Sequence, residues 1–216
     1  MQTHGSMLAS ASPEFYDRYM GPAQIEVYAR DLAKRLDLKS GALLETAAGT
    51  GILTRILATT LPDAVTITAT DLNQPRIAYA AVQPGTARVT WRQADALALP
   101  FGDGAFDLVI CQFGVMFFPD KTAAYRETLR VLRPGGRFVF NVWDRVEEND
   151  FPRIVSEALS VLFPDDPPRF LSDMACGYND ADIIRDQLRT AGFGSIAIEP
   201  VEATSRFESA DRKSVV

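Results

Sequence analysis

Glycines and carboxylates with the spacing of a nucleotide-binding site lie in the first half of the chain. The run Glu45-Thr46-Ala47-Ala48-Gly49-Thr50-Gly51 follows a short apolar segment and precedes an amphipathic one. Small residues at such a junction let backbone N–H groups and the positive end of a helix dipole approach a ligand. The dinucleotide fingerprint G-x-G-x-x-G is incomplete, because its third glycine is absent. By itself the run is therefore also compatible with a plain structural turn.

Two aspartates follow at the ends of the next two predicted strands. Asp71 lies about 20 residues after the glycines, where a carboxylate can accept hydrogen bonds from both hydroxyls of a ribose. Asp95 can accept a hydrogen bond from an exocyclic amino group of adenine. Either residue alone could instead be a helix cap or a solvated loop residue. Their common position at strand ends favours a nucleoside-like ligand.

Strand-like and helix-like segments alternate, which indicates how these residues are brought together. This alternation predicts a parallel sheet covered on both faces. The predicted strands are 42–46, 65–71, 89–94, 106–113, 137–143 and 195–201. The predicted helices are 52–61, 75–82, 121–132, 151–163 and 180–191, the last capped by Asn179 and ended by Gly192. The polar residues named above then share the carboxyl edge of one sheet.

Composition excludes several classes of function. The 216 residues, 47% of them hydrophobic, fit one globular domain. A net charge of −6 without a dense basic run argues against nucleic acid as the main partner. Cys111, Cys176 and His4 are too few for a zinc site, and we expect free thiols in the cytoplasm rather than one disulfide. No apolar stretch has the length of a membrane span, and no signal peptide is recognisable.

Five motifs taken together resemble those of the class I S-adenosylmethionine-dependent methyltransferases. Segment 44–51 is similar to their first motif, and segment 68–73 to their second. Segment 93–101 is similar to their adenine motif, while 101–107 and 129–137 resemble the segments that lead into their fourth and fifth strands. The resemblance covers roughly Glu14 to Val201. It is closest to the branch that methylates small molecules and quinone precursors.

The resemblance implies a fold, a cofactor and a reaction. The fold would be α/β, a Rossmann-like doubly wound and mostly parallel sheet, forming a single domain over residues 14–216. Residues 1–13 would be disordered or left from an expression tag. S-adenosylmethionine would donate its methyl group by in-line displacement to an O, N or C nucleophile of a small molecule. A non-catalytic protein that binds S-adenosylmethionine or S-adenosylhomocysteine is the alternative, and a nicotinamide oxidoreductase is disfavoured by the missing glycine.

The resemblance also assigns roles to individual positions. The main chain from Ala47 to Gly51 would face the methionine part of the cofactor. The implied cofactor-binding residues are Tyr19, Glu45, Ala47, Gly49, Gly51, Asp71, Leu72, Asn73, Ala94, Asp95, Ala96, Gln112 and Phe113. The implied substrate-binding residues are Tyr16, Met116, Phe117 and Trp143. Tyr19 is the speculative candidate for a catalytic base, and no metal is expected.

Two segments are expected to cover this site. The aromatic run 15–22 would fold over the cofactor as a lid, unless it is simply an amphipathic helix packed on the sheet. An insertion at about 147–178 would complete the acceptor pocket. Its aromatic and proline residues suit an apolar or aromatic substrate, although surface packing or a dimer contact explains them nearly as well. We expect a monomer or a homodimer.

The chain departs from the family pattern at two places. Ala47 replaces the first glycine of the cofactor loop, which alanine can do if its φ angle stays negative. Segment 202–216 is short for a turn plus an antiparallel seventh strand. We therefore expect that strand to be lacking or irregular, which would expose a sheet edge.

Overall fold

Five parallel strands form the centre of the structure, a computed structural model that describes residues 12–204. Their order across the sheet is β3-β2-β1-β4-β5, and every pairing is parallel. The strands are β1 Gly41–Glu45, β2 Val65–Asp71, β3 Val89–Gln93, β4 Phe106–Gln112 and β5 Leu132–Asn141. The chain runs outward from β1 to β3 and then returns to β4 beside β1. This reversal leaves a crevice at the carboxyl ends of β1 and β4, where open α/β sheets bind ligands.

The sheet is buried on both faces because successive side chains of a strand point to opposite sides. Leu43 of β1 and Ile110 of β4 belong to the larger hydrophobic cluster. Their neighbours Leu44 and Val109 belong to a second, smaller cluster. All four side chains are fully buried, which explains why these strands are nearly continuous apolar runs.

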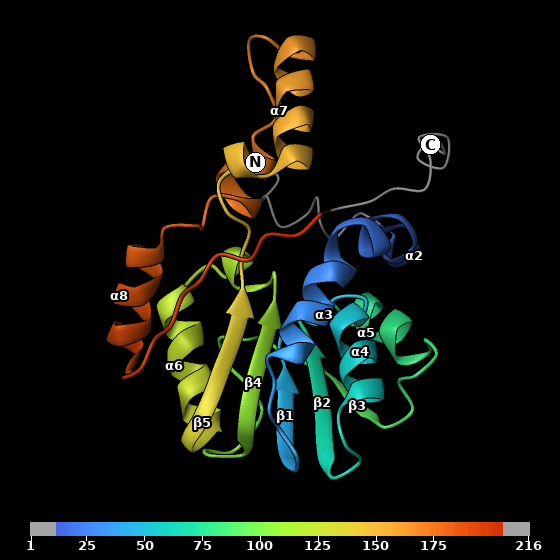
Figure 1. Ribbon diagram of the computed structural model, residues 1–216, viewed down its shortest axis with the longest axis vertical. Helices are drawn as coiled ribbons and strands as arrows, with labels where there is room; N and C mark the ends of the chain where they lie inside the picture. Colours follow the sequence, from blue (N-terminus) through green and yellow to red (C-terminus); the bar gives the residue numbers. More distant parts are fainter. Residues whose placement is uncertain (1–11, 205–216) are drawn as a thin grey trace.

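Helices that precede or follow the strands in sequence cover the sheet (Figure 1). They are α3 Glu26–Lys34, α4 Ile52–Thr60, α5 Gln74–Ala81, α6 Lys121–Val131 and α8 Ala181–Ala191. The side chain of Asn73 caps α5 and that of Asp120 caps α6, because each accepts a backbone N–H of the first turn. In Figure 1, α3, α4 and α5 lie beside the β1–β3 half of the sheet, and α6 and α8 lie beside β4 and β5.

Two groups of elements lie beyond the carboxyl edge of the sheet, toward which the strand arrows in Figure 1 point. The first is the short helix α2 Pro13–Phe15 followed by the π-helix η1 Tyr16–Ile25, which leads into α3. The second comprises the segments that follow β4 and β5. These are η2 Val115–Phe117, η3 Val146–Glu148, α7 Asp150–Leu162 and η4 Leu171–Ala175. The helix α7 projects from the body, and none of its residues is buried.

Most predicted elements are confirmed to within two residues at each end, but three predictions are wrong. The predicted strand 195–201 is irregular and mostly exposed, so the described sheet ends at β5. Only Phe193 and Ile196 of this region pack on the core. Pro200 has no N–H to donate to a ladder, and β-propensity alone does not hold an unpartnered strand.

The other two corrections concern the N-terminal cap of α8 and the first residue of β5. Asp180, and not Asn179, caps α8, because its carboxylate accepts the N–H groups of Asp182 and Ile183. The amide of Asn179 instead donates to the carbonyl of Cys176. The strand β5 begins at Leu132 and not at residue 137, since segment 134–136 forms an irregularity in its register with β4.

Several expectations about the chain as a whole can be compared with residues 12–204. Cys111 and Cys176 are buried free thiols, as predicted. No helix in this range is long and apolar enough to cross a bilayer. Ser12 caps α2 and Pro13 begins it, whereas the rest of the expected extension 1–13 lies outside the described residues. A seventh strand was expected to be lacking or irregular in segment 202–216. Residues 205–216 of that segment also lie outside the described residues.

Candidate functional site

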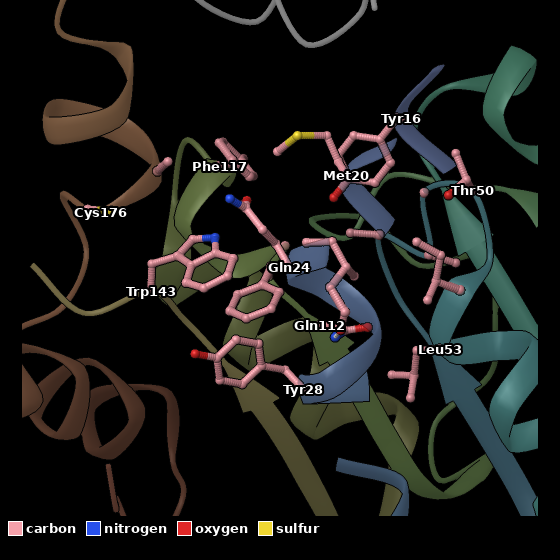
Figure 2. A pocket seen from close by; sticks show the side chains of 18 of the residues that line it. Tyr16, Met20, Gln24, Tyr28, Thr50, Leu53, Gln112, Phe117, Trp143 and Cys176 are labelled. Carbon is pink, nitrogen blue, oxygen red and sulfur yellow. Dashed lines mark hydrogen bonds between the residues drawn. The ribbon is translucent and has the colours of Figure 1, made fainter. Parts of the chain in front are cut away.

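A cavity of about 840 Å³ lies at the carboxyl edge of the sheet. Its floor is formed by the ends of β1, β2 and β4, and its walls by η1 and by the segments that follow β3, β4 and β5. Figure 2 places Trp143 and Tyr28 near Gln112, while Tyr16 lies toward Thr50. Within the described residues, no group of three potential ligands could hold a metal ion.

The loop after β1 is fixed by the two strands on either side of it. The N–H of Thr46 donates to the carbonyl of Ile110 in β4, at 2.9 Å, and the N–H of Ala48 donates to that of Thr70 in β2, at 2.9 Å. Gly51 ends the loop at φ 79°, and a Cβ there would lie 2.8 Å from the ring of Trp91. The loop therefore needs a glycine at its junction with α4.

Ala47 adopts a left-handed conformation with φ 53°, so the expectation of a negative φ is wrong. This conformation costs a non-glycine residue about 1–2 kcal/mol. The side chain of Ala47 packs against Gly114, where a Cβ would lie 2.6 Å from that of Ala47. Phe113, just before Gly114, is the other non-glycine residue with a positive φ, at 48°. Two strained loops thus meet at this point, a distribution common at functional sites.

The carboxylate of Asp71 links the ends of β1 and β2. Its Oδ2 accepts the N–H of Gly49 at 2.8 Å, and its Oδ1 accepts the N–H of Asn73 at 2.8 Å. A carboxylate has about four acceptor positions, so two remain for a ligand. Asp71 lines the cavity although its side chain is nearly buried. It can therefore accept hydrogen bonds from a ligand while it holds the loop.

The turn after β3 forms another part of the wall. The Oδ1 atom of Asp95 accepts the N–H of Leu97 at 2.9 Å, and its carbonyl accepts the N–H of Ala98 at 3.0 Å. Across from this turn, Leu72 leaves 66% of its surface exposed while it lines the cavity. An exposed leucine beside a fixed carboxylate suits a flat ring with an amino group at its edge.

Glu45 is the buried acid of the site, with 1% of its surface exposed. Its Oε2 accepts the hydroxyl of Thr54 at 2.6 Å. Burial raises the pKa of Glu45 to about 8, and the charge of Asp71 adds to this, while Thr54 and Arg55 oppose it. The carboxyl group therefore keeps its proton to a higher pH than an exposed glutamate does.

Aromatic side chains form the remaining wall. The rings of Phe113 and Trp143 stack with centroids 4.0 Å apart, and Tyr28 meets both edge-on at 5.5 Å and 5.3 Å. Phe117 stacks on Phe170 of the insertion at 6.3 Å. All five line the cavity. An apolar aromatic region thus adjoins the region of the carboxylates.

The comparisons with known proteins agree with this arrangement. Residues 44–140 match the family model described as a methyltransferase domain. The demethylmenaquinone methyltransferase of Thermus thermophilus is 42% identical over 113 residues, which cover 51% of this chain and 50% of the relative. The ubiquinone/menaquinone biosynthesis C-methyltransferase UbiE of Geobacter sulfurreducens is 34% identical over 55% of this chain and 48% of the relative. The chain thus spans about half the length of these curated relatives.

A solved structure shares the fold over a longer stretch. It is a methyltransferase from Methanococcus maripaludis described as S-adenosylmethionine-dependent, with a TM-score of 0.64 and 19% identity over 89% of this chain and 84% of that one. Residues 44–140 of the chain therefore match the methyltransferase family, and the fold is the one that class I methyltransferases share. The predicted family and the Rossmann-like fold are confirmed. S-adenosylmethionine is the methyl donor of this family, as expected from the motifs.

The fold brings most of the predicted site residues to one cavity. Thirteen line it: Tyr16, Glu45, Ala47, Gly49, Asp71, Leu72, Ala94, Asp95, Ala96, Gln112, Phe113, Phe117 and Trp143. The four others do not, namely Tyr19, Gly51, Asn73 and Met116. Tyr19 packs on Phe15 instead, and Met116 is buried in the core.

Sequence reasoning missed several lining residues of the N-terminal helices, among them Met20, Gln24 and Tyr28. Together with Tyr16 they recur every four residues, so they share one side of a helical segment. That spacing is a signal that could have identified them. Tyr16 itself is mostly enclosed, and burial raises its pKa to about 12, so it remains a neutral phenol.

Replacing Ala47 by glycine should stabilise the protein. Glycine adopts φ 53° without the steric cost, so the free energy of unfolding should rise by about 1 kcal/mol in urea titrations. Ala48 has no positive φ, and Ala48→Gly should instead destabilise by roughly 0.5–1 kcal/mol. An equal decrease in the free energy of unfolding in both variants would show that the backbone at Ala47 is not strained.

Replacing Glu45 by glutamine should remove a pH dependence of stability. The folded pKa of about 8 lies above the ordinary value of 4.5, so the folded state retains a proton that the unfolded state loses. Wild-type stability should fall relative to Glu45→Gln as the pH rises from about 4.5 to 8, and level off above. The exposed variant Glu157→Gln is the control in denaturant titrations across this range. A pH-independent difference would contradict the prediction.

Proposed function

We propose that this methyltransferase transfers a methyl group from S-adenosylmethionine to a small acceptor with an apolar aromatic ring. The observation that carries the proposal is that a single cavity joins the carboxylates at the strand ends to the aromatic wall. A donor with ribose, adenine and methionine parts matches the first region. An aromatic acceptor matches the second.

The residues of the first region fit the donor. Asp71 has acceptor positions left for the ribose hydroxyls, and Asp95 with the N–H of Ala96 would bind the adenine edge. Leu72 would be covered by the adenine ring. Open space surrounds the α-carbon of Gly49, so the main chain there is accessible to the methionine part. The loop thus offers backbone groups, and Asp71 and Asp95 offer carboxylates.

The donor supplies an activated methyl carbon on a sulfonium ion, so alignment is the main task of the protein. Phe113, Trp143 and Tyr28 would orient the acceptor ring and exclude water from it. The described residues contain no histidine that could serve as a base. Tyr19, the speculative base, lies outside the cavity wall. The proposed mechanism therefore assigns no catalytic base.

The names of the relatives suggest a chemical class for the acceptor. They describe methylation of demethylmenaquinone in one protein and ubiquinone or menaquinone biosynthesis in the other. We infer a hydroxylated aromatic ring of the quinol type as the acceptor of this chain. The two free thiols support a reducing compartment such as the cytoplasm, and the acidic net charge supports a small molecule rather than nucleic acid. No observation favours a non-catalytic binding protein.

Calorimetric titration tests the donor. The wild type should bind S-adenosylmethionine and S-adenosylhomocysteine but not NADH. Asp71→Asn should weaken donor binding by roughly 10–100-fold, because it removes a charged acceptor from the ribose site. Asp37→Asn, on an exposed side chain far from the cavity wall, should bind like the wild type. If the wild type fails to bind either compound, the proposed donor is wrong.

An activity assay tests the acceptor. A reduced demethylmenaquinone analogue with a short side chain is incubated with S-adenosylmethionine, and the methylated product is measured by mass spectrometry. Trp143→Ala should raise the acceptor KM about tenfold or more, since it removes a stacked ring from the wall. Phe163→Ala, which changes an exposed ring outside the cavity, is the matched control. Donor binding without any product would favour the non-catalytic alternative.

A further inference from the structure

Asp17 of η1 joins three elements that surround the cofactor loop. Its Oδ1 accepts the hydroxyl of Thr50 at 3.1 Å and the Nη2 of Arg55 at 2.7 Å. Its Oδ2 accepts the hydroxyl of Tyr79 in α5 at 3.2 Å. Thr50 belongs to the loop itself and Arg55 to α4. One carboxylate therefore ties the N-terminal π-helix to the loop, to α4 and to α5.

The cluster of Asp17, Thr50, Arg55 and Tyr79 is largely buried, and its members are hydrogen-bonded to one another. The side chains of Asp17 and Arg55 are 15% and 24% exposed, whereas most other ion pairs of the described chain have at least one largely exposed partner. Arg55 also donates its Nη1 to the carbonyl of Thr50 at 2.9 Å. Burial and the charge of Asp17 raise the pKa of Tyr79, which keeps that hydroxyl a donor. Charge-assisted hydrogen bonds in such surroundings are stronger than those between neutral groups.

The segment that Asp17 holds forms one wall of the cavity. Tyr16, Met20 and Gln24 of η1 and Tyr28 of α3 all line it (Figure 2). A π-helix is a rare and poorly stabilised form, and η1 contains Pro22, which lacks an N–H. Its position must therefore depend on tertiary contacts.

Three contacts hold η1 at different points along its length. At its C-terminal end, Gln112 donates its Nε2 to the carbonyl of Ile25 at 2.9 Å. In the middle, Gly21 packs so closely on Ile52 that a Cβ would lie 2.8 Å from its Cδ1 atom. At the N-terminal end, Asp17 makes the contacts described above. Loss of Asp17 would free the end that carries Tyr16.

We propose that Asp17 is a positioning residue that holds the segment 16–28 closed over the bound methyl donor through Thr50, Arg55 and Tyr79. The inference rests on the proposed function, since it presumes that the donor occupies the cavity. Asp17 does not line the cavity, so it acts through Tyr16 and Thr50, which do. Donor release then requires the N-terminal end of the segment, which carries Tyr16, to detach from this cluster, while Tyr28 at the other end keeps its place in the aromatic wall.

The test compares donor release and steady-state kinetics in Asp17→Asn and the wild type. Asparagine keeps the size but removes the charge, so dissociation of radiolabelled S-adenosylhomocysteine, measured by rapid filtration, should be about tenfold faster. The KM for S-adenosylmethionine should rise by a similar factor, while the KM for the acceptor stays within about twofold. Asp31→Asn, which breaks the Asp31–Arg35 pair of α3 outside the cavity, is the matched control and should behave like the wild type.

If Asp17→Asn folds poorly, a second variant and a double-mutant cycle still test the inference. Tyr79→Phe removes one hydrogen bond but keeps the ring, and should speed release about threefold. Thr50→Val combined with Asp17→Asn should be less than additive, because both remove the same contact. Wild-type release rates in Asp17→Asn and Tyr79→Phe, or a lowered kcat with unchanged donor KM, would overturn the inference. Failure of the wild type to bind the donor would instead overturn the proposed function.

Discussion

The hydrogen bonds that join the loop after β1 to its neighbouring strands are the constraint on which the site depends. Thr46 is bonded to β4, Ala48 to β2, and the carboxylate of Asp71 to Gly49. The path of the loop is therefore set by the order of strands in the sheet. Because β1 lies between β2 and β4, its loop is held from both sides at the place where the chain reverses.

The position of this loop divides the cavity into two chemically different regions. Toward β2 and β3 lie fixed carboxylates and an exposed leucine, which suit a nucleoside. Toward β4 and β5 lie stacked rings, which suit an apolar acceptor. The left-handed backbone at Ala47 and Phe113 lies where these regions meet. Strain is concentrated where donor and acceptor would have to approach each other, and the packing of Ala47 on Gly114 holds both loops there.

Much of the fold could be predicted because the pattern of apolar residues in the sequence agrees with the burial of those residues in the structure. The strand β2, for example, is a β-branched run with the predicted bounds of 65–71. The predicted strand 195–201 failed because its apolar residues are compatible with a strand but do not supply a partner for one. The cap of α8 failed because Asn179 and Asp180 are both good caps, and only tertiary contacts decide between them.

The candidate site could be predicted where a residue lies at a strand end, as Asp71 and Asp95 do. The sequence could not show that Ala47 has a positive φ, because the pairing with both neighbouring strands imposes it. It also could not show that Asp17 meets Arg55 and Tyr79, since these residues are 38 and 62 positions away. Tyr19 was chosen because it lies in the aromatic run 15–22, whereas Tyr28 lies beyond that run. Residues 16–25 form a π-helix and not the expected α-helix, so the side chains that share a face of that segment differ from the predicted ones.

The two tryptophans of the chain give this arrangement an optical consequence. Trp91 packs under Gly51 at the end of the cofactor loop, and its buried Nε1 has no hydrogen-bond partner within the described residues. Trp143 stacks on Phe113 at the other side of the loop. The tryptophan emission of the protein therefore comes from one residue beneath the end of the cofactor loop and one that lines the cavity. The molecule carries its own pair of unlabelled reporters, one with a buried indole N–H and one within the aromatic wall.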